Sequence, residues 1–151
     1  MVVVVQTTNI LAQEFQKSGL DLDLLVNLFA EWKSLGAQGE DAVYEFGKDV
    51  PYERPHVNSV KNVLRHVHLV PILDVESKIA WDKAWERASR RTSNRALVYV
   101  DDGPEKFLLI AILPEPVAHA VSRMLTPQDK AVMTRFAEIA ESFIYAGKVI
   151  A

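Results

Sequence analysis

The clearest pattern of hydrophobic and polar positions lies near the middle of the chain. Two apolar runs, Ala96–Val100 and Phe107–Leu113, flank the polar segment 101–105. That segment contains Gly103 and Pro104, which favour a turn and interrupt strand pairing. The runs are short, rich in Val, Ile, Leu, Tyr and Phe, and do not alternate with polar residues. They therefore predict an antiparallel hairpin in the centre of a sheet.

The rest of the chain alternates between strand-like and helix-like patterns. Strands are expected at Val2–Gln6 and within Val57–Val70. Apolar residues at helical spacing predict helices at 21–35, 74–90, 117–125 and from 126 to about 147, with Asp21 and Thr126 as N-caps and Gly36 and Gly147 as stops. The segment 12–17 is ambiguous, and 36–55 is expected to be a loop with a short helical turn at 40–46, because Gly and Pro recur through it. This order predicts an α+β fold with a small antiparallel core sheet and packed helices.

Length and composition limit the number of domains and the kinds of site that the chain can have. A chain of 151 residues favours one domain with a sizeable core, and it has no cysteine. Disulfides, thiolate chemistry and cysteine-based zinc sites are thereby excluded, which fits a cytoplasmic protein. The apolar start of the chain is too short for a signal peptide, and no run is long enough to span a membrane. The net charge of −3 lacks the basic field of most nucleic-acid binders, so RNA binding would need a local basic patch.

His66 and His68 lie two positions apart on an expected strand, so both rings face the same side. Three interpretations stay open for them. They can be a partly buried structural pair, or two ligands of a metal site that lacks an evident third ligand. They can also transfer protons, because a histidine with an ordinary pKa titrates near neutral pH.

The densest positive cluster precedes the hairpin and consists of Arg90, Arg91 and Arg95. A cluster at a helix end is often simply solvated, but guanidinium groups also bind phosphate in a bidentate way. Thr92, Ser93 and Asn94 add hydrogen-bond donors, although such residues are also typical of turns. We expect Arg90, Thr92, Asn94, Arg95 and Arg123 to bind substrate if the cluster is functional.

His119 and Arg123 lie four apart, on one face of a short expected helix. The side chain of Tyr99 can point to either side of the hairpin. The hairpin can bring Tyr99 and Arg91 close to the face that carries His66 and His68. No Gly-rich phosphate loop, nucleophile elbow or His-Glu-X-X-His motif is present, which disfavours ATP-driven and serine-hydrolase chemistry.

Several segments together resemble a known family. They are 41–44 (DAVY), 66–69 (HVHL), 91–94 (RTSN), 97–99 (LVY), 108–116 (LLIAILPEP) with His119, and 133–137 with Ala140 and Phe143. In this order they resemble the YafO-type toxins of bacterial type II toxin–antitoxin systems. The resemblance implies a ribosome-dependent mRNA endonuclease that blocks translation and is held inactive by a cognate antitoxin. It also implies a compact RelE-like architecture in a bacterial cytoplasmic protein.

RNA cleavage without a metal or cofactor needs a base for the 2′-OH, an acid for the leaving 5′-oxygen and positive charge for the transition state. We expect His66 and His68 to share the two proton transfers. Arg91 would bind the scissile phosphate, and Thr92 or Tyr99 would orient it. His119 is the alternative acid or base. Two other functions stay open: a non-enzymatic protein-binding module on a toxin-like fold, and a free RNA-binding protein without ribosome dependence.

Overall fold

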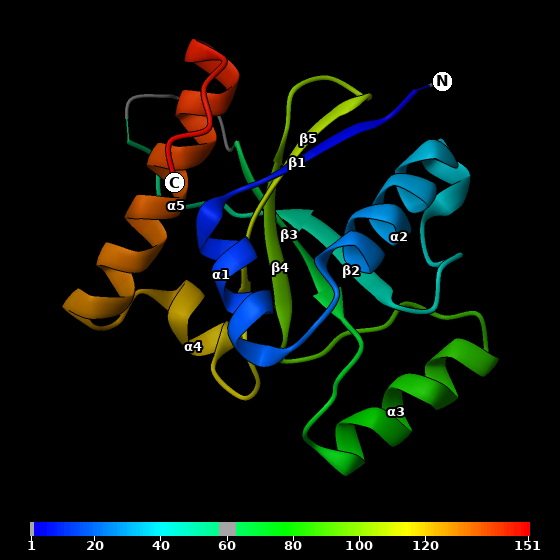
Figure 1. The fold of residues 1–151 in the computed structure, drawn as a ribbon. Coiled ribbons are helices and arrows are strands. Elements are labelled where there is room, and N and C mark those ends of the chain that lie inside the picture. Colours follow the sequence, from blue (N-terminus) through cyan, green and yellow to red (C-terminus); the bar gives the residue numbers. More distant parts are fainter. Residues whose placement is uncertain (1, 58–62) are drawn as a thin grey trace.

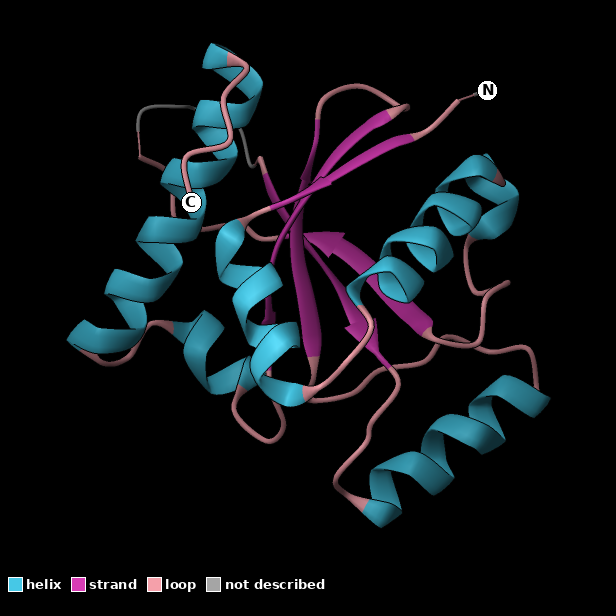
Figure 2. Cartoon of the chain, viewed as in Figure 1, coloured by secondary structure: helices cyan, strands magenta, loops and turns pink. Residues whose placement is uncertain are grey.

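The computed structural model describes residues 2–57 and 63–151 (Figure 1). Within them the strands are β1 (Val4–Thr7), β2 (Phe46–Pro51), β3 (Leu64–Leu69), β4 (Ala96–Asp101) and β5 (Lys106–Leu113). The helices are α1 (Asn9–Ser18), α2 (Leu22–Ser34), α3 (Val75–Glu86), α4 (Ala118–Arg123) and α5 (Pro127–Ala146), with a short 3-10 turn at Gly36–Gly39. The predicted α+β class is confirmed (Figure 2). The RelE-like detail of the architecture stays a prediction.

The strands form one five-stranded sheet in the order β1-β5-β4-β3-β2. The predicted hairpin is β4 and β5, which pair antiparallel in the middle of the sheet. Strands β2 to β5 are antiparallel to their neighbours, as expected, but β1 pairs parallel to β5, so the sheet is mixed. Of the strand region expected at 57–70, residues 58–62 lie outside the described residues.

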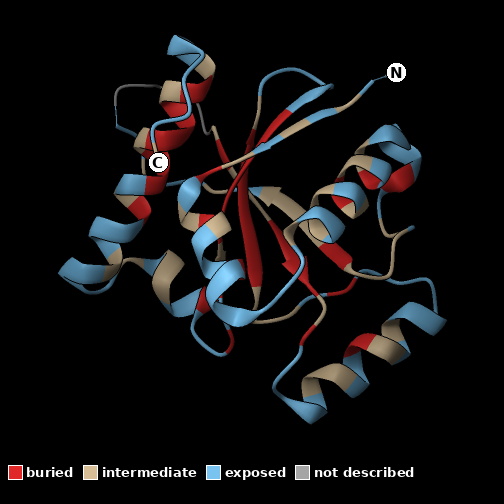
Figure 3. Ribbon diagram, in the orientation of Figure 1, coloured by how far each residue is buried: buried red, intermediate tan, exposed pale blue. Residues whose placement is uncertain are grey.

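Helices cover both faces of the sheet and bury most of its side chains (Figure 3). On one face, Val98 and its neighbours pack against α4 and α5; we call this the α5 face. On the other, Leu97, Val67 and Tyr99 pack against α1 and α2; we call this the α2 face. Because successive strand residues point to opposite faces, neighbours in sequence on β3 and β4 belong to different cores.

Helix boundaries follow the expected capping chemistry. The Asp21 carboxylate accepts a hydrogen bond from the backbone N–H of Leu24 at 3.3 Å, and the Thr126 hydroxyl accepts one from Asp129 at 3.1 Å. Gly147 ends α5 with a φ of 66°, in the left-handed region that glycine enters most readily. These caps confirm the predicted starts of α2 and α5 and the end of α5.

Two elements differ from the sequence-based expectation. Helix α1 occupies the ambiguous segment, and Thr8 caps it while donating its hydroxyl to the Ile110 carbonyl at 2.6 Å. Strand β2 lies inside the expected loop. It tolerates glycine and proline because it is a terminal strand. Gly47 is required there, since a Cβ atom would lie 2.2 Å from the carbonyl oxygen of Arg91.

Candidate functional site

The expected site residues are divided between the two faces of the sheet. On β3 and β4, His66 lies opposite Val98, and Arg65 lies opposite Tyr99. His66 and His68 therefore share the α5 face, as predicted, whereas Tyr99 lies on the α2 face with Arg65. The expectation that Tyr99 comes close to the histidine face is wrong, because strand alternation sends the two sets of side chains to opposite sides.

The histidines on the α5 face form a row of ring contacts. Tyr52 stacks on His66 with ring centroids 4.0 Å apart, His66 lies 5.5 Å from His68, and His68 lies 5.5 Å from His119. His119 is exposed near the start of α4, so the row runs from the interior to the surface. The structure thus brings together three of the predicted catalytic residues.

The two strand histidines sit in surroundings that disfavour their charged forms. Burial, with the neighbouring His68, lowers the pKa of His66 to about 4, and burial likewise lowers that of His68 to about 4. The Nδ1 atom of His66 is buried without a hydrogen-bond partner among the described residues, while His68 Nδ1 lies 2.9 Å from the backbone nitrogen of Ser93. Both rings are therefore neutral near pH 7 and are poor proton donors there.

These depressed pKa values predict a pH-dependent stability. Between about pH 6.5 and pH 4 the unfolded chain binds protons on His66 and His68 that the folded protein does not. The free energy of unfolding therefore holds its full value above pH 6.5 and falls as the pH drops toward 4, by roughly 3 kcal/mol for each ring. Urea unfolding across this range should show the fall. It should be clearly smaller in His68→Gln and only slightly smaller in His119→Ala, because burial is the main cause of both depressed pKa values and the charge of His119 a lesser one. Equal slopes in all three proteins would contradict the assignment.

Arg91 is not the exposed phosphate ligand that the sequence suggested. Its side chain is 1% exposed, and its guanidinium donates to the carbonyls of Phe46 at 2.7 Å and Val43 at 2.9 Å. It also lies over the rings of Trp85 and Trp81, at 4.8 Å and 5.4 Å from their centroids. In this conformation Arg91 attaches α3 and the 41–47 segment to the sheet. Figure 1 shows α3 lying apart from the other helices, so the contacts of Arg91 are important for holding α3 against the rest of the fold.

The other expected substrate-binding residues do not converge. Arg90 is exposed and pairs with Glu40 at 3.4 Å, and Arg95 donates to the Val70 carbonyl at 3.1 Å. Asn94 joins the start of the hairpin to α4 by donating to the Pro116 carbonyl and accepting from the backbone N–H of His119. Thr92 and Arg123 are exposed. Asn94 and Arg95 are therefore committed to internal contacts, and only Arg90, Thr92 and Arg123 face solvent.

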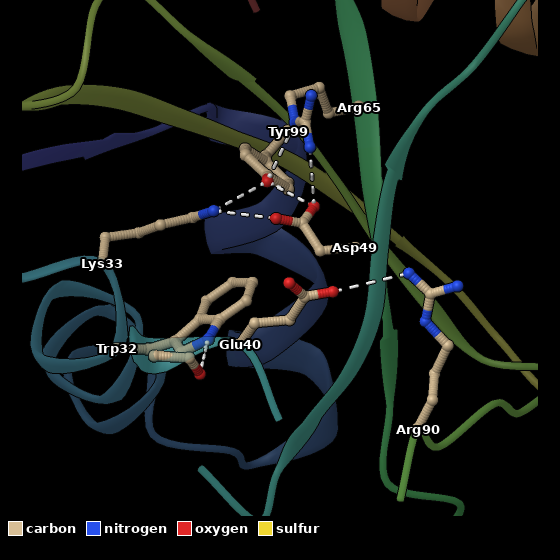
Figure 4. Close-up of polar contacts among 8 residues, drawn as sticks. Trp32, Lys33, Glu40, Asp49, Arg65, Arg90 and Tyr99 are labelled. Atoms are coloured by element: carbon tan, nitrogen blue, oxygen red, sulfur yellow. Dashed lines mark hydrogen bonds and ion pairs between the residues drawn. The ribbon is translucent and has the colours of Figure 1, made fainter. Parts of the chain in front are cut away.

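A second polar group, on the α2 face, was not predicted as a unit. Four side chains from four elements meet there: Lys33 from α2, Asp49 from β2, Arg65 from β3 and Tyr99 from β4 (Figure 4). We call these four residues the Asp49 cluster. Lys33 Nζ lies 2.9 Å from Asp49 Oδ2 and 3.0 Å from the Tyr99 hydroxyl. Tyr99 donates to Asp49 Oδ1 at 2.5 Å, and Arg65 donates its Nε–H to the Tyr99 oxygen at 3.2 Å.

The Asp49 cluster combines two cations and one carboxylate at the wall of a pocket with one phenol that is buried behind them. The pocket has a volume of about 220 Å³ and is lined by Trp32, Lys33, Gly36, Ala37, Glu40, Asp49 and Arg65. Burial, followed by the charge of Asp49, raises the pKa of Tyr99 well above its ordinary value, so the phenol keeps its proton at neutral pH. The side chains of Lys33, Asp49 and Arg65 are 19%, 14% and 26% exposed, which leaves them accessible from the pocket.

Sequence reasoning missed three members of the Asp49 cluster for identifiable reasons. Asp49 lies in a segment read as a loop, and Lys33 reads as an ordinary polar residue near the end of a helix. The position of Arg65 could have been predicted in part. Strand alternation places its side chain on the same face as Val67 and on the opposite face from His66. Its pairing with Tyr99 depends on the strand register, which the sequence pattern does not fix.

Comparison with known proteins gives one family. The family described as Toxin YafO, type II toxin-antitoxin system, matches residues 30–145. No curated protein and no solved structure matches the chain. Among the described residues, no helix has the length and apolar character needed to cross a membrane. No group of three or more metal-ligating side chains is found in ranges 2–57 and 63–151.

Proposed function

From the premise that this chain belongs to the YafO toxin family of type II toxin–antitoxin systems, we propose that it is an endoribonuclease that cleaves ribosome-bound mRNA at the Asp49 cluster. Membership of the family makes the chain a toxin and implies an antitoxin as its partner. The observation that carries the proposed chemistry is the meeting of four side chains: Lys33, Asp49 and Arg65 line one pocket, and the buried Tyr99 hydroxyl lies in hydrogen-bond contact with all three. These groups supply the charge, the base and the acid that RNA cleavage requires.

Lys33 and Arg65 are suited to hold the scissile phosphate. Both are cationic and both line the pocket, and their partner in the free protein is a carboxylate, which resembles phosphate as a hydrogen-bond acceptor. The ammonium of Lys33 also lies 4.1 Å from the centroid of the Trp32 ring, which restricts its position. Two fixed cations at the phosphate would stabilise the charge that grows on its oxygens as the 2′-oxygen attacks.

Asp49 and Tyr99 are suited to move the two protons. Asp49 would take the proton of the 2′-OH, so that the 2′-oxygen forms a bond to phosphorus. The bond from phosphorus to the 5′-oxygen then breaks, and Tyr99 would give its proton to that oxygen. The products are a 2′,3′-cyclic phosphate and a 5′-hydroxyl. Tyr99 and Asp49 share a 2.5 Å hydrogen bond in the free protein, so the proton on Asp49 can return to the tyrosinate once the products have left, which restores the starting state.

The ribosome would supply the affinity for RNA that this acidic chain lacks. The net charge is −3, so free RNA would gain little from the overall field of the protein. A site with two local cations needs the mRNA to be presented to it, and a translating ribosome in the bacterial cytoplasm does this. The histidine row on the α5 face stays a second predicted location for proton transfer.

Expression of the chain without its antitoxin should therefore stop bacterial growth by stopping translation. Pulse labelling with an amino acid should show a fall in protein synthesis within minutes, and primer extension should show new 5′ ends within translated messages. The same messages with their start codons removed should stay intact. Unchanged protein synthesis at high expression would remove the endonuclease proposal and favour a module that only binds protein. Cleavage of untranslated messages would favour a free ribonuclease.

A further inference from the structure

We propose that the carboxylate of Asp49 occupies the position of the substrate phosphate in the free protein, so that substrate binding displaces it. This inference rests on the proposed function, because it assigns the anion-binding position within that same site. It identifies the ligand class as a phosphate group and makes Asp49 an internal competitor of that ligand.

The donors of the Asp49 cluster converge on this one carboxylate. Lys33 reaches Oδ2 at 2.9 Å, Tyr99 donates to Oδ1 at 2.5 Å, and a terminal nitrogen of Arg65 lies 3.5 Å from Oδ1. Donors from three elements therefore surround a single carboxylate. Arg65 makes only this one long contact with Asp49, because its Nε–H is donated to Tyr99, so it does not pair with the carboxylate in a bidentate way. The same donors would fit a tetrahedral group with one more acceptor oxygen.

Two of the donors lie on inner strands, whereas the carboxylate lies on a terminal strand. Tyr99 lies on β4 in the middle of the sheet and is 0% exposed, and Arg65 lies on β3 between two paired strands. Asp49 lies on β2, the terminal strand, which pairs only with β3. The pairing of β2 is irregular between Phe46 and Asp49, so the strand is not held by a continuous ladder there. A small shift of β2, or a rotamer change of Asp49, would vacate the position.

Displacement would also activate the base. In the free protein the Asp49 carboxylate is engaged by Lys33, by Arg65 and by the Tyr99 hydroxyl, so its oxygens are already occupied. A phosphate that takes these donors leaves Asp49 beside the bound nucleotide with fewer partners. Its oxygens are then free to accept the hydrogen bond of the 2′-OH when substrate is in place.

Binding of inorganic phosphate to the purified protein tests this inference without any RNA cleavage. Titration followed by NMR should show that Asp49→Asn binds phosphate about tenfold more tightly than the wild type, or better, because a unit charge is removed at contact distance. Asp49→Ala should show a similar gain, and adding Lys33→Gln to Asp49→Asn should abolish it. The matched control is Glu40→Gln, which removes an equal charge from the pocket rim and releases Arg90. Its affinity should change less than about threefold, since the donors stay occupied.

The outcomes separate this inference from the proposed function. Phosphate affinity that does not rise in either Asp49 variant overturns the inference, and so does an equal rise in Glu40→Gln, which would show only a general effect of charge. RNA cleavage by the wild-type protein is measured separately and decides the proposed function. A protein that shows the predicted phosphate affinities but cleaves no message would keep the anion site and lose the nuclease.

Discussion

Asp49→Asn is expected to reduce cleavage of ribosome-bound mRNA by about 100-fold or more, which is the usual scale for one acid–base group. The amide keeps the shape of the side chain but cannot take the proton of the 2′-OH. The free energy of unfolding should change little. Asp49 is on an edge strand, and its partners Lys33 and Arg65 line the pocket, where water can solvate their charges. Single-turnover cleavage followed by primer extension, with saturating toxin, measures the chemical step apart from binding.

The Asp49→Asn substitution is expected to change phosphate binding and cleavage in opposite directions. The same variant is expected to bind phosphate more tightly and to cleave more slowly, a combination that simple misfolding cannot produce. Tyr99→Phe should also slow cleavage, since it removes the proton donor and keeps the ring in its buried position. Cleavage by Asp49→Asn at the wild-type rate would show that the base lies elsewhere.

Arg91→Ala is expected to destabilise the fold by roughly 3 kcal/mol, because it leaves several carbonyls without a donor and removes the contact with the buried Trp81 and the exposed Trp85. Arg91 is 1% exposed and donates to the carbonyls of Val43 and Phe46. Urea or thermal unfolding followed by circular dichroism measures the loss. Cleavage should fall only as far as the folded fraction falls.

Arg90→Ala is the matched control for this change. Arg90 is the preceding residue with the same chemistry, but it is exposed and pairs with the exposed Glu40 at 3.4 Å. Its loss should cost about 1 kcal/mol or less. If Arg91→Ala unfolded at the same urea concentration as Arg90→Ala and yet abolished cleavage, the original expectation of a phosphate contact at Arg91 would regain support.

The parts of the fold that local chemistry determines were predictable from the sequence. The β4–β5 hairpin follows from two uninterrupted apolar runs around a Gly-Pro turn. The N-caps at Asp21 and Thr126 follow from side chains that can accept a backbone hydrogen bond. The shared face of His66 and His68 follows from the two-residue period of a strand. Each of these features depends on residues close together in the chain.

The features that depend on long-range pairing were not predictable in the same way. Strand β2 contains glycine, proline and charged residues, and it forms because β3 offers it a partner. The burial of Arg91 depends on carbonyls about 45 to 50 positions away. The Asp49 cluster requires a register in which Arg65 lies opposite Tyr99 and a helix that ends beside β2. No local sequence pattern determines these long-range contacts.

The most direct test of the account compares two consecutive residues of β3 that face opposite sides of the sheet. Arg65 belongs to the Asp49 cluster on the α2 face, and His66 belongs to the histidine row on the α5 face. The measurement is the single-turnover rate of cleavage of ribosome-bound mRNA by Arg65→Met and by His66→Gln, at pH 7 and equal folded fractions. We predict that Arg65→Met loses cleavage by about 100-fold or more while His66→Gln cleaves near the wild-type rate. Loss of cleavage in His66→Gln with full activity in Arg65→Met would contradict the account and place the reaction on the α5 face.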